Sequence, residues 1–313
     1  MNKLKTFQKK EIAGALLLLA IFILPIVSLA GGNKKIYVDA DANGIQNGSE
    51  EHPYGKISQA LKGAKKNAEV HISSGIYREN IVIPKGVEIF GSDKDKVIIK
   101  AKNSSLPAVK MNHKTEINKV TVEGGRYGIV IDDGDRASVI ECIVKNNKKD
   151  GIKIKEARVN DKYKANIIET LIKDNGRSGI YSQKRRLVLI DNEIYGNGSD
   201  GIDIEKGSTA WIKGNRINHN DGSGLKLTLD GSEIWTKGNT YHSNEREGME
   251  INAYGDAGRI DVNKSKFYKN DRYGITKIER NHFGKTVWGG LTIRDNNIFW
   301  NNKKANISDK IKI

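Results

Sequence analysis

The chain has 313 residues, enough for one large domain with a sizeable core, and carries a formal net charge of +15. Cys142 is the only cysteine, so an intramolecular disulfide is excluded and packing and backbone hydrogen bonds must stabilise the fold. The basic residues are spread along the chain without a nucleic-acid-binding motif. The excess charge therefore favours acidic polysaccharide, cell-envelope polymers or anionic lipid as partners, with no nucleic acid expected, unless it serves solubility alone.

The first 30 residues are typical of an export signal. A Lys-rich start precedes an apolar run from Ile12 to Leu29, and Ser28-Leu29-Ala30 fits a small-x-small cleavage site. The run is nearly long enough to span a bilayer, so residues 1–30 are either a cleaved signal peptide or a membrane anchor. In both cases the rest is exported to the extracellular space, the cell surface or the periplasm, and meets a membrane only through this segment.

Residues 36–70 are expected to form the N-terminal end of the domain. A strand at Ile36–Val38 is followed by a short amphipathic helix over about residues 55–66. This helix is expected to cover the open end of stacked strands and to shield their unpaired edges. Its apolar stripe consists of Ile57, Ala60, Leu61 and Ala64.

From residue 71 onward, short apolar segments and Gly/Asn turns repeat. An Asn or Asp lies three residues after an apolar anchor and recurs every 23 to 31 residues. One repeat is too short to bury its own apolar face, so the repeats must stack as a coil of parallel strands. Stacked amides then form a hydrogen-bonded ladder, predicted at Asn146, Asp174, Asn197, Asn220, Asn244, Asn270 and Asn301. A second column is predicted at Asn192, Asn215, Asn239 and Asn296.

This repeat, together with the opening "KKIYVDADANGIQNGSEEHPYGKISQALKGAKKNAEV", resembles the right-handed parallel β-helix proteins of the pectate-lyase superfold over roughly residues 35–310. The resemblance implies an all-β fold, a single-stranded right-handed parallel β-helix with a short N-terminal capping helix. The domain would span 31–313, with the strand and capping helix in 36–70 and the rungs in 71–313. Such a fold hosts many functions, so the resemblance indicates a fold more strongly than an activity.

In the strand after each repeated glycine, the residue between two inward apolar side chains should point outward. Successive rungs about 4.8 Å apart would then display Tyr181, Asp203, Lys226 and Glu250 in one column, with Asp200 at the preceding turn. One interpretation is a charge ladder, in which alternating signs on adjacent rungs relieve repulsion.

The other interpretation is a polysaccharide site. Asp200, Asp203 and Glu250 could hold Ca²⁺ against an acidic sugar, while Lys226, with a lowered pKa, removes a proton beside the sugar carboxyl as catalytic base. Hydrolysis by the pair Asp203 and Glu250 is a further alternative. The segment "NGSDGIDI" is similar to a polygalacturonase strand motif. However, "NDGSGLKL" on the next rung lacks the expected Asp-Asp pair, and the Gly-His-Gly and Arg-x-Lys motifs are absent, which disfavours that hydrolase. Pectate lyases as a class place calcium carboxylates and a basic residue on such a face, and this chain matches them in residue type only.

Two insertions, residues 156–165 and 277–290, could wall a sugar groove beside this face. An aromatic ring there would stack on a sugar, and cations would meet its carboxylates or sulfates; the alternative is that both are solvated loops without function. The predicted substrate-binding residues are Arg280, His282, Lys285, Trp288, Arg158 and Tyr181. The six histidines are scattered without an i,i+4 pair, which argues against a zinc site.

The sequence therefore predicts an exported surface protein that binds anionic polysaccharide without turnover. The alternative is a polysaccharide-active enzyme, namely a Ca²⁺-dependent lyase acting on uronic-acid glycans. The enzyme requires the acidic residues and Lys226 to converge in a groove with strongly perturbed pKa values. A flat, salt-paired and open face would favour the binding protein.

Overall fold

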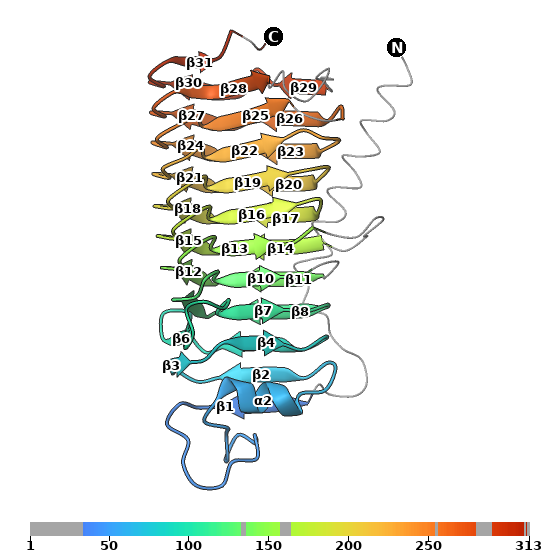
Figure 1. The fold of residues 1–313 in the computed structure, drawn as a ribbon, viewed down its shortest axis with the longest axis vertical. Helices are drawn as coiled ribbons and strands as arrows, with labels where there is room; N and C mark the ends of the chain where they lie inside the picture. Colours follow the sequence, from blue (N-terminus) through green and yellow to red (C-terminus); the bar gives the residue numbers. More distant parts are fainter. Residues whose placement is uncertain are drawn as a thin grey trace. The chain divides into compact units, whose positions relative to one another are not determined.

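Each turn of the chain contributes three short strands, and equivalent strands of successive turns pair in parallel (Figure 1). The computed structural model describes residues 34–132, 136–156, 164–253, 256–279, 290–309 and residue 311. These residues form a coil of parallel strands with one short helix. The predicted all-β, single-stranded parallel β-helix is therefore confirmed.

The strands form three sheets, which we number 1 to 3 in the order in which each turn visits them; sheet 1 has 11 strands and the others 10 each. Sheet 1 contains β1 (Lys35–Val38), β2 (Glu69–Ile72), β5 (Glu88–Gly91), β8 (Thr115–Asn118), β11 (Ala137–Ile140), β14 (Lys164–Ile168), β17 (Arg186–Ile190), β20 (Thr209–Lys213), β23 (Glu233–Lys237), β26 (Arg259–Asn263) and β29 (Gly290–Ile293). Sheet 2 contains β3 (Gly75–Arg78), β6 (Val97–Lys100), β9 (Thr121–Glu123), β12 (Ile143–Lys145), β15 (Leu171–Lys173), β18 (Glu193–Tyr195), β21 (Arg216–Asn218), β24 (Thr240–His242), β27 (Lys266–Tyr268) and β30 (Ile298–Trp300). Sheet 3 contains β4 (Ile81–Ile83), β7 (Val109–Met111), β10 (Ile129–Ile131), β13 (Ile152–Ile154), β16 (Ile180–Gln183), β19 (Ile202–Glu205), β22 (Leu225–Thr228), β25 (Met249–Ala253), β28 (Tyr273–Glu279) and β31 (Ala305–Ile307).

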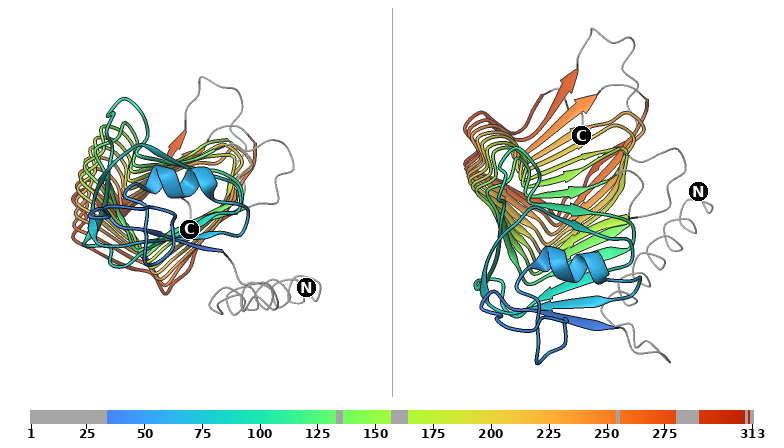
Figure 2. Two further views of the ribbon diagram at one scale, coloured as in Figure 1. Left: turned by 90° about the horizontal axis from the view of Figure 1, so that it is seen from below. Right: turned by 60° about the horizontal axis from the view of Figure 1, so that its bottom comes forward.

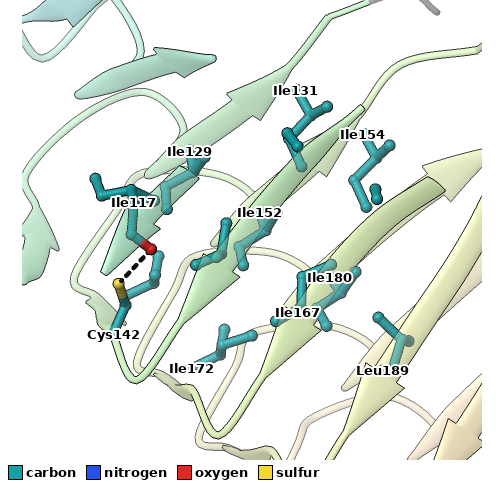
Figure 3. Packing of buried hydrophobic residues seen from close by; sticks show 14 of the residues in the cluster. Ile117, Ile129, Ile131, Cys142, Ile152, Ile154, Ile167, Ile172, Ile180 and Leu189 are labelled. Atoms are coloured by element: carbon teal, nitrogen blue, oxygen red, sulfur yellow. Dashed lines mark hydrogen bonds between the residues drawn. The ribbon is translucent and has the colours of Figure 1, made fainter. Parts of the chain in front are cut away.

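Aliphatic side chains fill the interior of the coil and stack on their equivalents in the next turn (Figure 3). Ile152 pairs in register with Ile129 and with Ile180, and all three are fully buried. Cys142 belongs to this core, with its Sγ 3.6 Å from the carbonyl oxygen of Ile117 (Figure 3). Burial raises the pKa of the Cys142 thiol to about 12, so this side chain packs as a small hydrophobe and is not a nucleophile.

A ladder of buried asparagine side chains runs through the turn between sheets 2 and 3. The Nδ2 of Asn197 donates to Oδ1 of Asn220 at 2.9 Å, and the Nδ2 of Asn220 donates to Oδ1 of Asn244 at 3.0 Å. Because every amide donates and accepts along the axis, the buried polar groups of the turn are satisfied. The complete ladder consists of Asn147, Asn175, Asn197, Asn220, Asn244, Asn270 and Asn302.

The predicted ladder residues Asn146, Asp174 and Asn301 are wrong by one position. Their φ angles are 53°, 54° and 54°, in the left-handed region, and each immediately precedes the true ladder residue. Asn and Asp are enriched in that conformation, so both neighbouring positions attract the same residue types. Positive φ also occurs before the other ladder residues, at Gly196, His219, Ser243 and Lys269.

A second polar column runs through the turn between sheets 1 and 2. The Nδ2 of Asn192 donates to Oδ1 of Asn215, and the Nδ2 of Asn215 donates to Oδ1 of Asn239, both at 2.9 Å, as predicted. The column ends on Asn297, whose Oδ1 accepts a backbone N–H of the preceding rung at 2.8 Å. The predicted member Asn296 is therefore also wrong by one position.

The helix α2 covers Ile57–Gly63 and is shorter than predicted. It contacts β1, β2 and β4 at the N-terminal end of the coil (Figure 2). The carboxylate of Glu79 accepts the backbone N–H groups of Ile57 at 2.8 Å and of Ser58 at 3.1 Å, which satisfies two donors of the first turn. Of the predicted stripe, Ile57, Ala60 and Leu61 are buried and Ala64 lies beyond the helix. Covering of the strand edges by α2 stays a prediction.

The repeated glycines permit close backbone approach, which gives a test of the stacking. A Cβ at Gly201 would lie 2.4 Å from Cγ2 of Ile217 and 2.7 Å from the carbonyl oxygen of Gly224. We expect Gly201→Ala to lower the free energy of unfolding by about 2 kcal/mol, because the two rungs must separate locally. Urea unfolding followed by circular dichroism measures the effect. Gly63→Ala is the matched control, since nothing lies within 4 Å of its added Cβ, and an equal loss in both variants would contradict the interpretation.

The predicted leader, residues 1–30, lies outside the described residues. Within the part of the chain that the structure describes, no helix is long and apolar enough to cross a membrane. Export and the boundaries of the domain stay predictions.

Candidate functional site

The outward residues of sheet 3 form the column that the sequence predicted. Asp203 pairs in register with Tyr181 on one side and with Lys226 on the other, and Lys226 pairs with Glu250. Asp200 lies in the turn that leads into β19. Parallel pairing at fixed register therefore brings side chains from four successive rungs onto one face.

Lys226 is held by two carboxylates of the neighbouring rung. Its Nζ lies 3.1 Å from Oδ2 of Asp203 and 3.7 Å from Oδ2 of Asp200. The other oxygen of Asp200 accepts the backbone N–H of Ser223 at 2.8 Å, whereas Oδ1 of Asp203 is buried without a hydrogen-bond partner among the described residues. Asp200 and Asp203 are only 5% and 6% exposed. Solvent therefore screens this ion pair much less than a surface pair.

One rung further, Glu247 and Glu250 form a second buried acidic pair that shares one hydroxyl. The Oγ of Ser223 lies 3.2 Å from Oε2 of Glu247 and 3.0 Å from Oε2 of Glu250, but it has a single proton to donate. Arg246 lies 3.6 Å from Glu247 and 3.3 Å from Glu250, and Arg272 lies 3.7 Å from Glu247. The two arginines thus compensate the negative charge of these buried glutamates.

Burial determines the direction of the pKa shifts of the acids in this cluster. It raises the pKa of Asp203 to about 7, although the Lys226 ammonium acts to lower it. Burial likewise raises the pKa of Asp200 and of Glu247. For Lys226, burial acts to lower the pKa, but Asp203 and Asp200 outweigh it and hold the pKa above its ordinary value.

The pKa of Lys226 is therefore raised and not lowered as predicted, which argues against Lys226 as a catalytic base; its role in a reaction stays a prediction. A lysine base needs a neutral amine near the working pH, and the neighbouring carboxylates stabilise the charged form instead. The sequence places Lys226 beside the acids but does not reveal that both acids bind it. Lys226 acts here as the half-buried counter-ion of the buried Asp203 and Asp200.

The predicted calcium site has no support in the described residues. Among them, no three or more His, Cys, Asp or Glu side chains form a group that could hold a metal ion. Asp200 and Asp203 face Lys226, while Glu250 faces Ser223, Arg246 and the Nδ2 of Asn252, which donates to its Oε1 at 3.1 Å. Two of the three proposed ligands thus face a lysine and the third faces an arginine, so each carboxylate already has a cationic partner.

Tyr181 is also engaged within the face. Its hydroxyl donates to Oε2 of Glu205 at 2.9 Å, and the Nε2 of Gln183 donates to the same oxygen at 2.6 Å. The Nζ of Lys153 lies 5.3 Å from the centre of the Tyr181 ring. The other predicted substrate-binding residues, Arg280, His282, Lys285, Trp288 and Arg158, lie outside the described residues.

The sequence interpretation missed Arg246 and Arg272. Both lie two residues before the repeated glycine, in the segments "NEREG" and "NDRYG". The same position holds other cations in earlier repeats, so a basic residue two places before glycine is the signal that could have found them. Its members in the described turns are Arg126, Lys149, Arg177, Arg246 and Arg272.

Known proteins with this architecture can now be compared. Residues 157–309 match the family model described as right handed beta helix region. Pectate lyase Pel9A is similar with a TM-score of 0.59 at 12% identity, covering 85% of this chain and 78% of that chain. The complex of XylC with xylose gives a TM-score of 0.65 at 11% identity, with 88% and 70% covered. The Agl-KA catalytic domain gives 0.53 at 12%, with 91% and 70% covered.

No curated protein matches the chain in sequence. At these identities the structural likeness shows the fold alone. The family model and the arrangement of the sheets together make the chain a right-handed parallel β-helix protein of the pectate-lyase type of fold. The fold resemblance inferred from the repeat is thereby confirmed.

Proposed function

We propose that this chain is an exported β-helix protein that binds anionic polysaccharide on its surface without turning it over. The observation that carries the proposal is the internal neutralisation of the acids on sheet 3. Lys226 neutralises Asp200 and Asp203, and Arg246 and Arg272 face Glu247. The salt-paired acids leave the chain's excess of positive charge on other parts of its surface, where polyanions are attracted.

The partner class is supported by chemistry and by fold. A rigid coil presents equivalent side chains at intervals of about 4.8 Å, which suits a linear polymer with regularly repeated charges. Pectate lyase Pel9A and the complex of XylC with xylose, whose names refer to carbohydrates, share this fold. An exported location follows from the predicted leader, which stays an expectation, as does contact with a membrane through residues 1–30.

A second candidate function is a polysaccharide lyase acting on uronic-acid glycans. One observation favours it: Asp203 has a pKa raised to about 7 by burial, and its Oδ1 has no hydrogen-bond partner in the described part of the chain. A carboxylate with such a pKa is suited to accept a proton near neutral pH. Asp203, rather than Lys226, would then be the base.

We expect the full chain to bind polygalacturonate and dextran sulfate, but not neutral dextran, in isothermal titration calorimetry. Raising the salt should weaken binding, because screening shortens the reach of the positive surface. The same mixtures, with and without added Ca²⁺, are followed by ultraviolet absorbance for unsaturated products. Binding without an absorbance rise is the expected result. A rise that disappears in Asp203→Asn would establish the lyase instead, and no binding to either polyanion would overturn the proposal.

A further inference from the structure

Three cations, from the turns between sheets 2 and 3 and from β13, lie near the ring of Tyr127. The Nζ of Lys153 lies 4.9 Å from the ring centre, the guanidinium carbon of Arg126 5.7 Å and the Nζ of Lys149 5.9 Å. Arg177 continues the same column on the next rung, because its backbone N–H donates to the carbonyl oxygen of Lys149 at 3.3 Å. We call Arg126, Tyr127, Lys149, Lys153 and Arg177 the Tyr127 patch.

The cations of the Tyr127 patch are not held in close ion pairs by the described residues. Within the described residues its four cations form no ion pair, and the adjacent carboxylate, Asp150, is 5% exposed. Burial raises the pKa of Asp150 even though Lys153, Arg177 and Lys149 act to lower it. Like charges one rung apart repel each other, so this column is held in an unfavourable arrangement.

The same turn position behaves differently nearer the C-terminus. There Arg246 and Arg272 lie against the buried Glu247, and Arg246 also against Glu250. A cation at this position of the repeat can therefore form an ion pair with an acid of the same turn. The acid at the position equivalent to Glu247 is Asp150, and the cations of the Tyr127 patch form no ion pair with it although it feels their charge. The patch therefore differs in the pairing of its cations, whereas its half-buried ring has a counterpart in Tyr273, which lies near Lys304.

We propose that the Tyr127 patch binds an anionic sugar unit of a glycan, with the carboxylate or sulfate among Lys149, Lys153 and Arg126 and the sugar ring beside Tyr127. An aromatic ring packs against the C–H groups of a sugar, while the cations recognise its charge. Arg177 extends the site by one rung toward the next charged unit. The site rests on the proposed function, since it locates where the polysaccharide binds.

The test compares two pairs of substitutions that remove equal charge. Lys149→Gln with Lys153→Gln removes two cations of the Tyr127 patch. Lys213→Gln with Lys237→Gln removes two exposed lysines that are paired in register on sheet 1. Calorimetry with polygalacturonate reports carboxylate binding and calorimetry with dextran sulfate reports sulfate binding. Thermal unfolding by circular dichroism checks that both proteins are folded, and Arg126→Gln with Arg177→Gln is a second patch variant.

We expect the patch variants to bind the preferred polyanion about tenfold more weakly, and the sheet 1 pair to change affinity less than about twofold. An equal loss of affinity in the patch variants and the sheet 1 pair, or no loss in the patch variants, would overturn the site. The proposed function would still stand in that case, because the wild-type protein binds the polyanion. Failure of the wild-type protein to bind either polyanion would overturn the proposed function and the site together. The polyanion that loses more affinity identifies whether carboxylate or sulfate is recognised.

Discussion

Asn220→Ala is expected to lower the free energy of unfolding by about 3–4 kcal/mol, because it interrupts the buried ladder near its centre. The Nδ2 of Asn220 donates to Oδ1 of Asn244 at 3.0 Å and to the carbonyl oxygens of Ile194 at 3.3 Å and Asn218 at 3.1 Å. Its Oδ1 accepts two hydrogen bonds from Asn197, at 3.2 and 2.9 Å. Alanine removes all five and leaves buried partners unsatisfied on both sides.

The effect is measured by urea unfolding, followed by far-ultraviolet circular dichroism. Asp221→Ala is the matched control, because Asp221 is the next residue in the chain, is exposed, and contributes its backbone N–H rather than its side chain to the turn. We expect the control to change the free energy of unfolding by less than about 0.5 kcal/mol. A loss in Asn220→Ala no larger than in Asp221→Ala would contradict the energetic role of the ladder.

The central ladder residues could be predicted because their anchors are unambiguous. Around Asn197, Ile194 is flanked by Glu193 and Tyr195, so only one register buries an aliphatic side chain. At the first rung of the asparagine ladder, both Ile143 and Val144 are apolar, and residues 146 and 147 are both asparagine. Sequence spacing cannot separate those registers. The structure separates them, because only the second asparagine points into the turn while the first has positive φ.

The candidate site shows a different limit. The period placed Asp203, Lys226 and Glu250 on adjacent rungs, and this order is correct. It did not indicate that the acids are almost fully buried, because burial depends on the surrounding turns rather than on one column. Whether the pKa of Lys226 is raised or lowered depends on the balance between burial, which lowers it, and the two carboxylates, which raise it. A sequence pattern contains neither quantity, so the expected lowered pKa was wrong.

Lys226→Met is expected to destabilise the protein by about 3–5 kcal/mol near pH 8, because it leaves the carboxylates of Asp200 and Asp203 buried without their cation. The side chains are similar in length, so packing changes little. Near pH 8 both carboxylates in the unfolded chain are ionised and fully solvated. The native variant must then either keep uncompensated buried charges or take up protons, and both cost free energy.

The free energy of unfolding should also depend on pH, because Asp203 titrates at different pH values in the folded and unfolded states. The pKa of Asp203 in the folded wild-type protein, about 7, lies above its ordinary value. Between these values the native state holds a proton that the unfolded state has lost, so this group makes stability fall as pH rises toward 7. Removing Lys226 removes the attraction that lowers this pKa, and the fall should extend to higher pH. Urea midpoints near pH 5 and pH 8 should therefore differ more in Lys226→Met than in the wild type.

Two further variants separate the buried ion pair from general loss of charge. Lys303→Met removes a pair that is shorter, 2.8 Å from Nζ to Oδ2 of Asp271, but whose lysine side chain is 66% exposed. Solvent already stabilises both of its charges, so we expect a change below about 1 kcal/mol at either pH. Adding Asp203→Asn to Lys226→Met removes one of the two orphaned carboxylates and should recover part of the lost stability near pH 8. Equal losses in the two lysine variants, or no recovery in the double variant, would mean that burial of Asp200 and Asp203 does not govern the electrostatics of sheet 3.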